Sequence, residues 1–360
     1  MHLPERPAWL KAAGYAGGLA LLVAAIWMAL AQDDGRVIEA LAQTSPVLIA
    51  GQALLAIASA AAIAASFWVV SNAYGPVRLD EMFALVGMAW LLNYLPMRPG
   101  LLGRVAYHKK YNGIAVRDSV RVLAVNGVAT LVCSIHAGLA AVVWFSNAGL
   151  AAFVLVAALP LIGAGTACVL LADRGPLAGV HAWRLLGSLV LHYVDIAVWA
   201  GRYALAAHVL DAQLTTAHAV VLAAISQFAF LVPIAGNGLG VREWSLGLAG
   251  LLGLAGAGAS FADGVDLELI NRAGELLAGL PVGLLGLWGV VRWKKHHEQR
   301  LQSRDRTDPA DAQSVESKGP SHATAAHGGQ DGQQDRAGPP EVPPDRPRQD
   351  PQGPAEVPDP

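Results

Sequence analysis

The stretch VLIAGQALLAIASAAAIAASFWVV, residues 47–70, decides the fold class, because it runs for 24 residues without a charged side chain. As an α-helix it would extend about 36 Å, which exceeds the roughly 30 Å hydrocarbon core of a bilayer. Lipid offers no hydrogen-bond partners to a backbone, so a chain that crosses it forms helices or a closed barrel. The chain holds six such apolar runs of 20 residues or more: Ala12 to Ala31, Val47 to Val70, Val122 to Phe145, Gly149 to Ala172, Leu185 to Leu210 and Leu267 to Val291.

The pattern favours helices over a barrel, because no segment alternates apolar and polar residues at period two. The first run follows Arg6 and Lys11 and resembles a signal peptide, but its 20 apolar residues exceed a typical signal-peptide core. We expect it to be retained as a span. The sequence therefore predicts an all-α, polytopic membrane helix bundle.

The composition changes at Leu301. From there to Pro360 the chain has no aromatic residue, Ile or Met, and it contains 11 of the 21 prolines. Its 11 acidic residues outnumber its 6 basic ones. Such a segment cannot bury enough apolar surface to offset its ordering entropy. We expect a membrane domain over residues 1–300 and a disordered, Pro-rich acidic tail over residues 301–360.

The distribution of Lys and Arg predicts the orientation, since cytoplasmic loops are enriched in them. Basic residues gather at the N-terminus, near Arg78, in Arg104 to Arg117, in Arg174 to Arg184 and in Arg292 to Arg300. The intervening loops are acidic. The predicted protein lies in the cell inner membrane, with both termini cytoplasmic.

Two shorter apolar runs do not fit a full crossing. Met82 to Leu95 is 14 residues long and precedes Pro96, whereas Ala217 to Val232 precedes Pro233 and a glycine-rich segment. The distribution of basic and acidic loops predicts that the two runs enter the membrane from opposite sides. We expect about six full spans and two re-entrant hairpins broken at these prolines, arranged as an inverted repeat, which is typical of transporters that bind substrate near the bilayer midplane. Eight full crossings are the alternative.

Arginines flank both predicted breaks. Arg98 and Arg104 surround the first, and Arg242 follows the second with Glu243 beside it. A guanidinium matches the oxygens of a phosphate, and the N-terminus of a broken helix also favours an anion. These residues are therefore predicted to contact a phosphate-bearing substrate. Alternatively, Arg98 and Arg104 belong only to the positive-inside set and touch lipid headgroups.

Polar stripes also mark two of the long runs. His192, Asp195 and Arg202 recur at helical spacing with Trp199 between the last two, and Glu268, Arg272 and Glu275 share one face of the last span. Ionisable groups inside a membrane usually face the bundle interior. An internal ion-pair network and a proton or substrate relay both remain open. We group His192, Asp195, Arg202, Arg272 and Glu275 as an intramembrane polar network.

Other chemistries lack their motifs. The chain has no GxxxxGK[ST], HExxH or paired CxxC, and its basic segments are short. Cys133 and Cys168 lie in apolar runs, where cysteine behaves as a small hydrophobic residue. We expect no cofactor, no metal site, no catalytic constellation and no nucleic-acid partner.

The two broken segments resemble the lysylphosphatidylglycerol synthase transmembrane-region family, the flippase-like or YbhN-type membrane domains. The first family pattern is N-x-x-x-P-x-R-x-G followed by R, and the second is P-x-P-G-G-x-G-x-R-E. The chain departs from the family at Leu101, Asn126, Gly127, Thr130 and Ala235. The residues that correspond are Asn93, Pro96, Arg98, Gly100 and Arg104 in the first half, with one residue fewer between Asn93 and Pro96 than the pattern has, and Pro233, Gly236, Gly238, Gly240, Arg242 and Glu243 in the second, with one residue more after Gly236.

The resemblance implies lipid handling. A phospholipid, a glycolipid or a polyprenyl-phosphate sugar would move between leaflets, with Asn93, Gly100, Gly238 and Gly240 joining the arginines at the substrate. The alternative is an accessory subunit of a membrane glycosyltransferase or lipid-modifying enzyme. The tail is too small and too polar for the soluble aminoacyl transferase domain of two-domain members. We therefore expect no synthesis of aminoacylated lipid.

Overall fold

The computed structural model describes residues 36–94, 99–146, 149–172, 174–177, 179–231, 236–256 and 258–307, together with residues 20, 23, 24 and 27. Most of the predicted first span lies outside this set. So do Pro96, Arg98 and Pro233, and the chain after Thr307.

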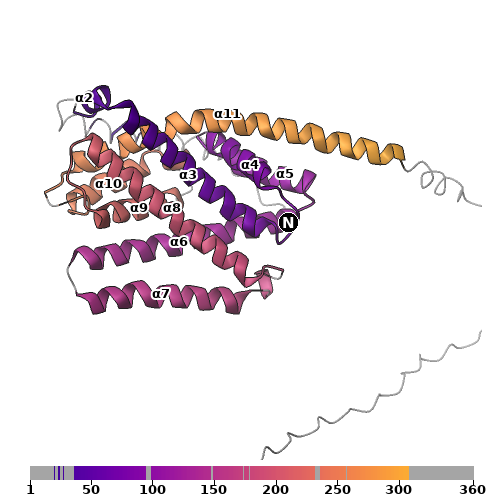
Figure 1. The fold of residues 1–360 in the computed structure, drawn as a ribbon, viewed down its shortest axis with the longest axis horizontal. Coiled ribbons are helices and arrows are strands. Elements are labelled where there is room, and N and C mark those ends of the chain that lie inside the picture. Colours follow the sequence, from indigo (N-terminus) through magenta and orange to yellow (C-terminus); the bar gives the residue numbers. More distant parts are fainter. Residues whose placement is uncertain are drawn as a thin grey trace, which may run out of the picture. The chain divides into compact units, whose positions relative to one another are not determined.

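The described residues form helices and no strand, which confirms the all-α prediction. Figure 1 shows the helices and their labels. They are α2 (Arg36–Gln43), α3 (Pro46–Ser71), α4 (Leu79–Leu92), α5 (Pro99–Tyr111), α6 (Val116–Phe145), α7 (Leu150–Leu171), α8 (Ala182–Val209), α9 (Thr216–Leu231), α10 (Val241–Leu251) and α11 (Phe261–Thr307), with 3-10 turns η1 (Gly175–Leu177) and η2 (Gly236–Gly238).

Four helices in the described part of the chain are long and apolar enough to cross a membrane. These are the whole of α3, the whole of α7, Val116–Trp144 of α6 and Phe261–Lys295 of α11. Helix α8 has 28 residues, but its polar stripe lowers its mean hydropathy. Many large apolar side chains on these helices are exposed, which suits a protein whose solvent is lipid.

Helices α3 and α8 pack side by side and antiparallel at the centre of the bundle (Figure 1). Polar residues seven apart on α3 meet polar residues seven apart on α8. A seven-residue repeat keeps one face of each helix along a shared seam. The three pairs are Gln52 with the Arg202 carbonyl at 2.8 Å, Ser59 with Asp195 at 2.5 Å, and Ser66 with Ser188 at 2.8 Å.

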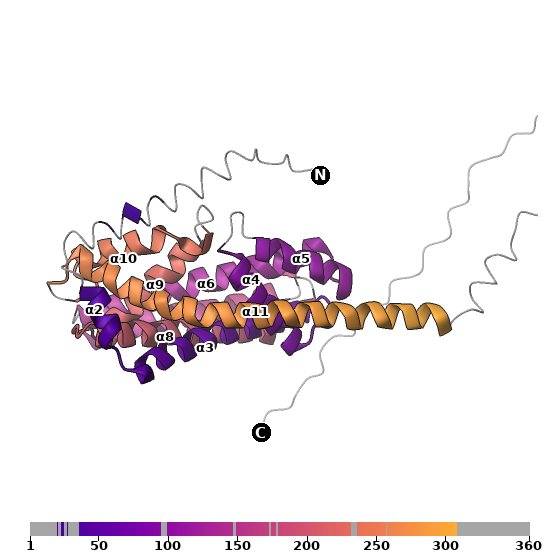
Figure 2. The same ribbon diagram turned by 90° about the horizontal axis from the view of Figure 1, so that it is seen from above.

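The shorter helices are held by close backbone contacts. A methyl group added at Gly87 of α4 would meet the Val282 carbonyl of α11, and one added at Gly286 would meet the backbone of Met88. Small residues allow such approaches between membrane helices. Figure 2 shows α4 and α5 alongside α11. Helix α9 packs in turn against α6, α8 and α10.

The helix α11 continues past the predicted domain boundary at Leu301 and ends at Thr307. Composition changes at Leu301, but a helix needs a breaker or a cap to stop, and the next proline is Pro309. The last helix therefore extends seven residues into the segment that the sequence assigns to the tail.

Candidate functional site

A cavity of about 340 Å³ lies between the helices and falls within the usual size range of ligand sites. Its walls come from α3, α4, α5, α6, α8, α9, η2 and α11. Several predicted residues meet there although they are far apart in the sequence. They are Asn93, Arg104, His192, Asp195, Arg202 and Glu275.

Arg104 is the cation of this cavity that has no acidic partner. It is only 7% exposed, and its guanidinium stacks on the Phe67 ring of α3, 3.7 Å from the ring centre. Among the ion pairs of the described residues, none includes Arg104. A buried charge is costly unless it is paired. Arg104 therefore gives the cavity a positive charge that no carboxylate of the described residues pairs with.

Asp195 on α8 also lines the cavity and is 1% exposed. Its Oδ1 accepts a 2.5 Å hydrogen bond from Ser59, and its Oδ2 accepts one from the amide of Gln227. The Trp199 indole donates to Ser59 at 3.1 Å and holds that hydroxyl in place. Asp195 thus has neutral donors on both oxygens and, within the described chain, no salt bridge.

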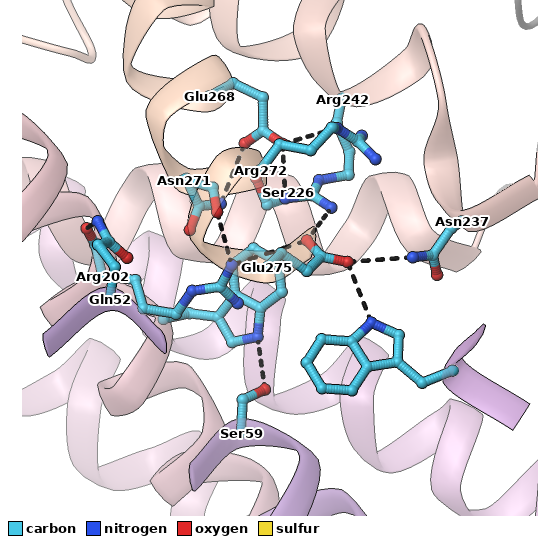
Figure 3. A network of polar contacts seen from close by, with 12 residues as sticks. Gln52, Ser59, Arg202, Ser226, Asn237, Arg242, Glu268, Asn271, Arg272 and Glu275 are labelled. Carbon is cyan, nitrogen blue, oxygen red and sulfur yellow. Dashed lines mark hydrogen bonds and ion pairs between the residues drawn. The ribbon is translucent and has the colours of Figure 1, made fainter. Parts of the chain in front are cut away.

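Arg242 does not line the cavity, contrary to the expectation that it contacts substrate. It is fully buried, and its two terminal nitrogens lie 2.5 Å from Glu268 and 2.8 Å from Glu275 (Figure 3). Its guanidinium also stacks against Trp199, 4.8 Å from the ring centre. The structure therefore places Arg242 in the protein's own ion-pair network, behind the cavity wall.

The rest of this network is equally buried. Arg272 lies 2.7 Å from Glu243, and Arg202 lies 3.7 Å from Glu275 while donating to the Asn271 carbonyl at 3.1 Å. These contacts favour the internal ion-pair network over a substrate contact for Arg272 and Glu243. Counted formally, the three arginines and three glutamates balance: Arg202, Arg242, Arg272, Glu243, Glu268 and Glu275.

Glu275 connects this network to both broken segments and also lines the cavity. Its Oε1 accepts hydrogen bonds from Trp90 at 3.3 Å and Tyr94 at 3.1 Å, at the end of α4. The same oxygen accepts one from Asn237 of η2 at 3.0 Å (Figure 3). The Glu275 carboxylate thus forms hydrogen bonds both with the segment before residues 95–98 and with the segment after residues 232–235.

The glycines that were predicted at the substrate site instead allow close packing and tight turns of the backbone. A methyl group at Gly100 would overlap the backbone of Ala89, so Gly100 lets α5 pack against α4. Gly238 and Gly240 have φ of 71° and 78°, which favour glycine, and they turn the chain into α10 just before Arg242. These glycines position helices, and they are absent from the cavity lining.

His192 faces a polar seam between α3, α6 and α8. Its ring nitrogens lie 3.4 Å from Ser66 and 3.4 Å from Thr130. Ser66 also donates to Asn126 at 2.6 Å. Four of the five positions at which the chain departs from the family pattern line the cavity, namely Leu101, Asn126, Gly127 and Thr130, and the fifth, Ala235, lies outside the described residues.

Five further residues of the cavity lining were not predicted from the sequence: Ser59, Phe67, Trp90, Gln227 and Asn237. A signal existed for two of them, because Ser59 and Gln227 interrupt apolar runs. Among the described residues no group of His, Cys, Asp and Glu could hold a metal ion. The chain matches no family model, no curated protein and no solved structure.

Proposed function

We propose that the protein binds the phosphate-bearing headgroup of a membrane lipid in this cavity and moves it between leaflets. The observation that carries the proposal is Arg104, a buried arginine that lines a cavity and has no carboxylate partner in the described chain. A phosphate would supply the missing negative charge. The guanidinium forms paired, charge-assisted hydrogen bonds with phosphate oxygens.

The proposed placement in the membrane rests on helix lengths. Helix α4 has 14 residues and α9 has 16, so they extend about 21 Å and about 24 Å, less than a bilayer core. Asn93 at the end of α4 and Asn237 after α9 line the same cavity. We take α4 with α5 and α9 with α10 as re-entrant hairpins of an inverted repeat in the inner membrane.

Both broken segments contribute residues to the cavity, which supports translocation of the lipid rather than binding alone. Each repeat contributes its broken segment to one site, and in inverted-repeat transporters the halves rock about such a site. The exposed apolar surface would let acyl chains remain in lipid while the headgroup occupies the cavity. The chain has no nucleotide-binding motif, so we assign no ATP-driven step.

A binding assay with matched variants tests the proposal. Purified protein in detergent would be titrated with dihexanoyl phosphatidylglycerol, a phosphate lipid that stays monomeric, with cavity tryptophan fluorescence as the readout. Arg104→Gln should weaken binding at least tenfold, and Arg104→Lys should recover part of it because the charge returns without the planar fork. The control is Arg78→Gln, since Arg78 is exposed and pairs with Asp80.

Two further measurements complete the test. Inorganic phosphate should bind far more weakly than the lipid, because it lacks the chains that hold a headgroup at the cavity. In proteoliposomes, exchange of a fluorescent phospholipid between leaflets should fall with Arg104→Gln and persist with Arg78→Gln. Lipid affinity and exchange that are both unchanged by Arg104→Gln would refute the proposed function.

A further inference from the structure

We infer that the bound headgroup carries a primary amine as well as a phosphate, with the amine at Asp195. This inference rests on the proposed function, since it places a second contact of the same ligand. Its starting observation is the carboxylate of Asp195, which lines the cavity, is 1% exposed and receives only neutral donors, Ser59 and Gln227.

The charges around the cavity separate into two sets. The three arginines and three glutamates of the buried network compensate one another through ion pairs. Arg202, the network arginine on the same helix as Asp195, is engaged by Glu275 and by the Asn271 carbonyl. Arg104 and Asp195 are left, one positive and one negative, on the cavity wall. A ligand that satisfies both must carry an anionic and a cationic group.

Helix α3 gives the approximate spacing of these two positions along its axis, through the residue that each one contacts. The Arg104 guanidinium stacks on Phe67, and Asp195 accepts its hydrogen bond from Ser59. The two α3 residues are eight positions apart, about 12 Å along the helix axis. A charge-assisted hydrogen bond of about 2.8 Å at each end leaves roughly 6 Å between the ligand's phosphate oxygen and its nitrogen.

That span matches a short headgroup. A two-carbon bridge between a phosphate ester and an amine, as in an ethanolamine phospholipid, has a reach of this order. On the α3 wall, Ala60 and Ile63 lie between the two positions and line the cavity. These apolar side chains suit the methylene groups of such a bridge. The geometry therefore points to an aminophospholipid, with its phosphate at Arg104 and its ammonium at Asp195.

The spare capacity of the Asp195 carboxylate fits this assignment. An ionised carboxylate accepts about four hydrogen bonds, and only two are used here. By contrast, Glu275 already accepts four hydrogen bonds, from Trp90, Tyr94, Asn237 and Arg242, and Arg202 lies 3.7 Å away. An incoming ammonium therefore has room at Asp195, whereas Glu275 is saturated.

The experiment compares two short-chain lipids on the same preparations. Dihexanoyl phosphatidylethanolamine and dihexanoyl phosphatidylglycerol share the phosphate, and only the first has an amine. Wild-type protein should bind the ethanolamine lipid at least tenfold more tightly. Asp195→Asn should abolish that preference and leave phosphatidylglycerol affinity within about threefold. Asp80→Asn is the control, because it removes an exposed carboxylate outside the cavity lining.

The outcomes separate the inference from the proposed function. Equal affinity of the wild type for the two lipids would overturn the amine site, and this readout needs no variant to fold. Equal weakening of both lipids by Asp195→Asn would overturn it too, since a structural carboxylate or a mere proton carrier would not distinguish an amine. Either result leaves the proposed phosphate site standing. That site would be refuted only if Arg104→Gln changed the affinity for neither lipid.

Discussion

The substitution Arg242→Gln tests whether this arginine supports the fold or the ligand. Arg242 is fully buried, with Glu268 at 2.5 Å and Glu275 at 2.8 Å. Removing one partner of a buried ion pair costs about 3–5 kcal/mol, because the remaining charge stays buried without compensation. Two carboxylates lose their closest partner here and keep only longer contacts, to Arg202 at 3.7 Å and Arg272 at 3.8 Å, so we expect the free energy of unfolding to fall by about 3–5 kcal/mol.

The assay is unfolding in mixed micelles of increasing SDS fraction, followed by tryptophan fluorescence. Arg78→Gln is the matched control, since its exposed ion pair contributes about 0–1 kcal/mol. A double-mutant cycle sharpens the result. Glu268→Gln neutralises one of the stranded carboxylates, so the double variant should be more stable than the two single losses imply, by about 1–3 kcal/mol.

Two results would refute this reasoning. One is a decrease in the free energy of unfolding for Arg242→Gln that is no larger than the decrease for the control Arg78→Gln. The other is a double variant whose loss equals the sum of the single losses within about 0.5 kcal/mol. The lipid affinity of the protein that remains folded provides a separate check. It should change less than threefold, because Arg242 is absent from the cavity lining.

Two further predictions concern packing and topology. Gly250→Ala should lower the unfolding temperature, because its methyl group would overlap the Ser260 carbonyl, whereas Gly163→Ala on α7 meets open space and should leave it unchanged or slightly raised. With both native cysteines replaced by alanine, Gln213→Cys should react with an impermeant thiol reagent on intact cells, and Lys109→Cys only after permeabilisation. Reaction of Lys109→Cys on intact cells would contradict the proposed hairpin of α4 and α5.

Much of the helical fold could be predicted from sequence because lipid imposes a simple rule. A chain in the bilayer must satisfy its backbone internally, and the runs 47–70, 122–145 and 149–172 do not alternate as barrel strands do, so the sequence predicts helices for them. They correspond to α3, α6 and α7. The polar stripe on α8 was equally predictable as inward-facing, since exposing Asp195 and Arg202 to lipid is costly. Both are 1% exposed.

The partners of the charged residues were harder to predict, because pairing depends on how helices meet. Glu268 and Glu275 share a helix face from their spacing alone, but nothing local shows which arginine reaches them. From the sequence alone, Arg242 was therefore predicted to contact the substrate. One usable signal was missed: Gln52, Ser59 and Ser66 are seven apart, as are Ser188, Asp195 and Arg202, which indicates a shared seam between two helices.

The division of charges suggests why some predicted residues are structural and others are left for a ligand. An arginine already paired with a carboxylate must break that contact before it binds a phosphate, so a paired arginine makes a weak anion site. Four residues at which the chain departs from the family pattern that it resembles share the cavity with Arg104, and none of them carries a charge: Leu101, Asn126, Gly127 and Thr130. The Arg104 guanidinium therefore remains available to an incoming anion, while the formally neutral network behind the cavity wall holds the residues beside the two broken segments. The proposed binding site and the buried ion-pair network thus lie side by side, and what distinguishes Arg104 from the network arginines is that no carboxylate of the described chain pairs with it.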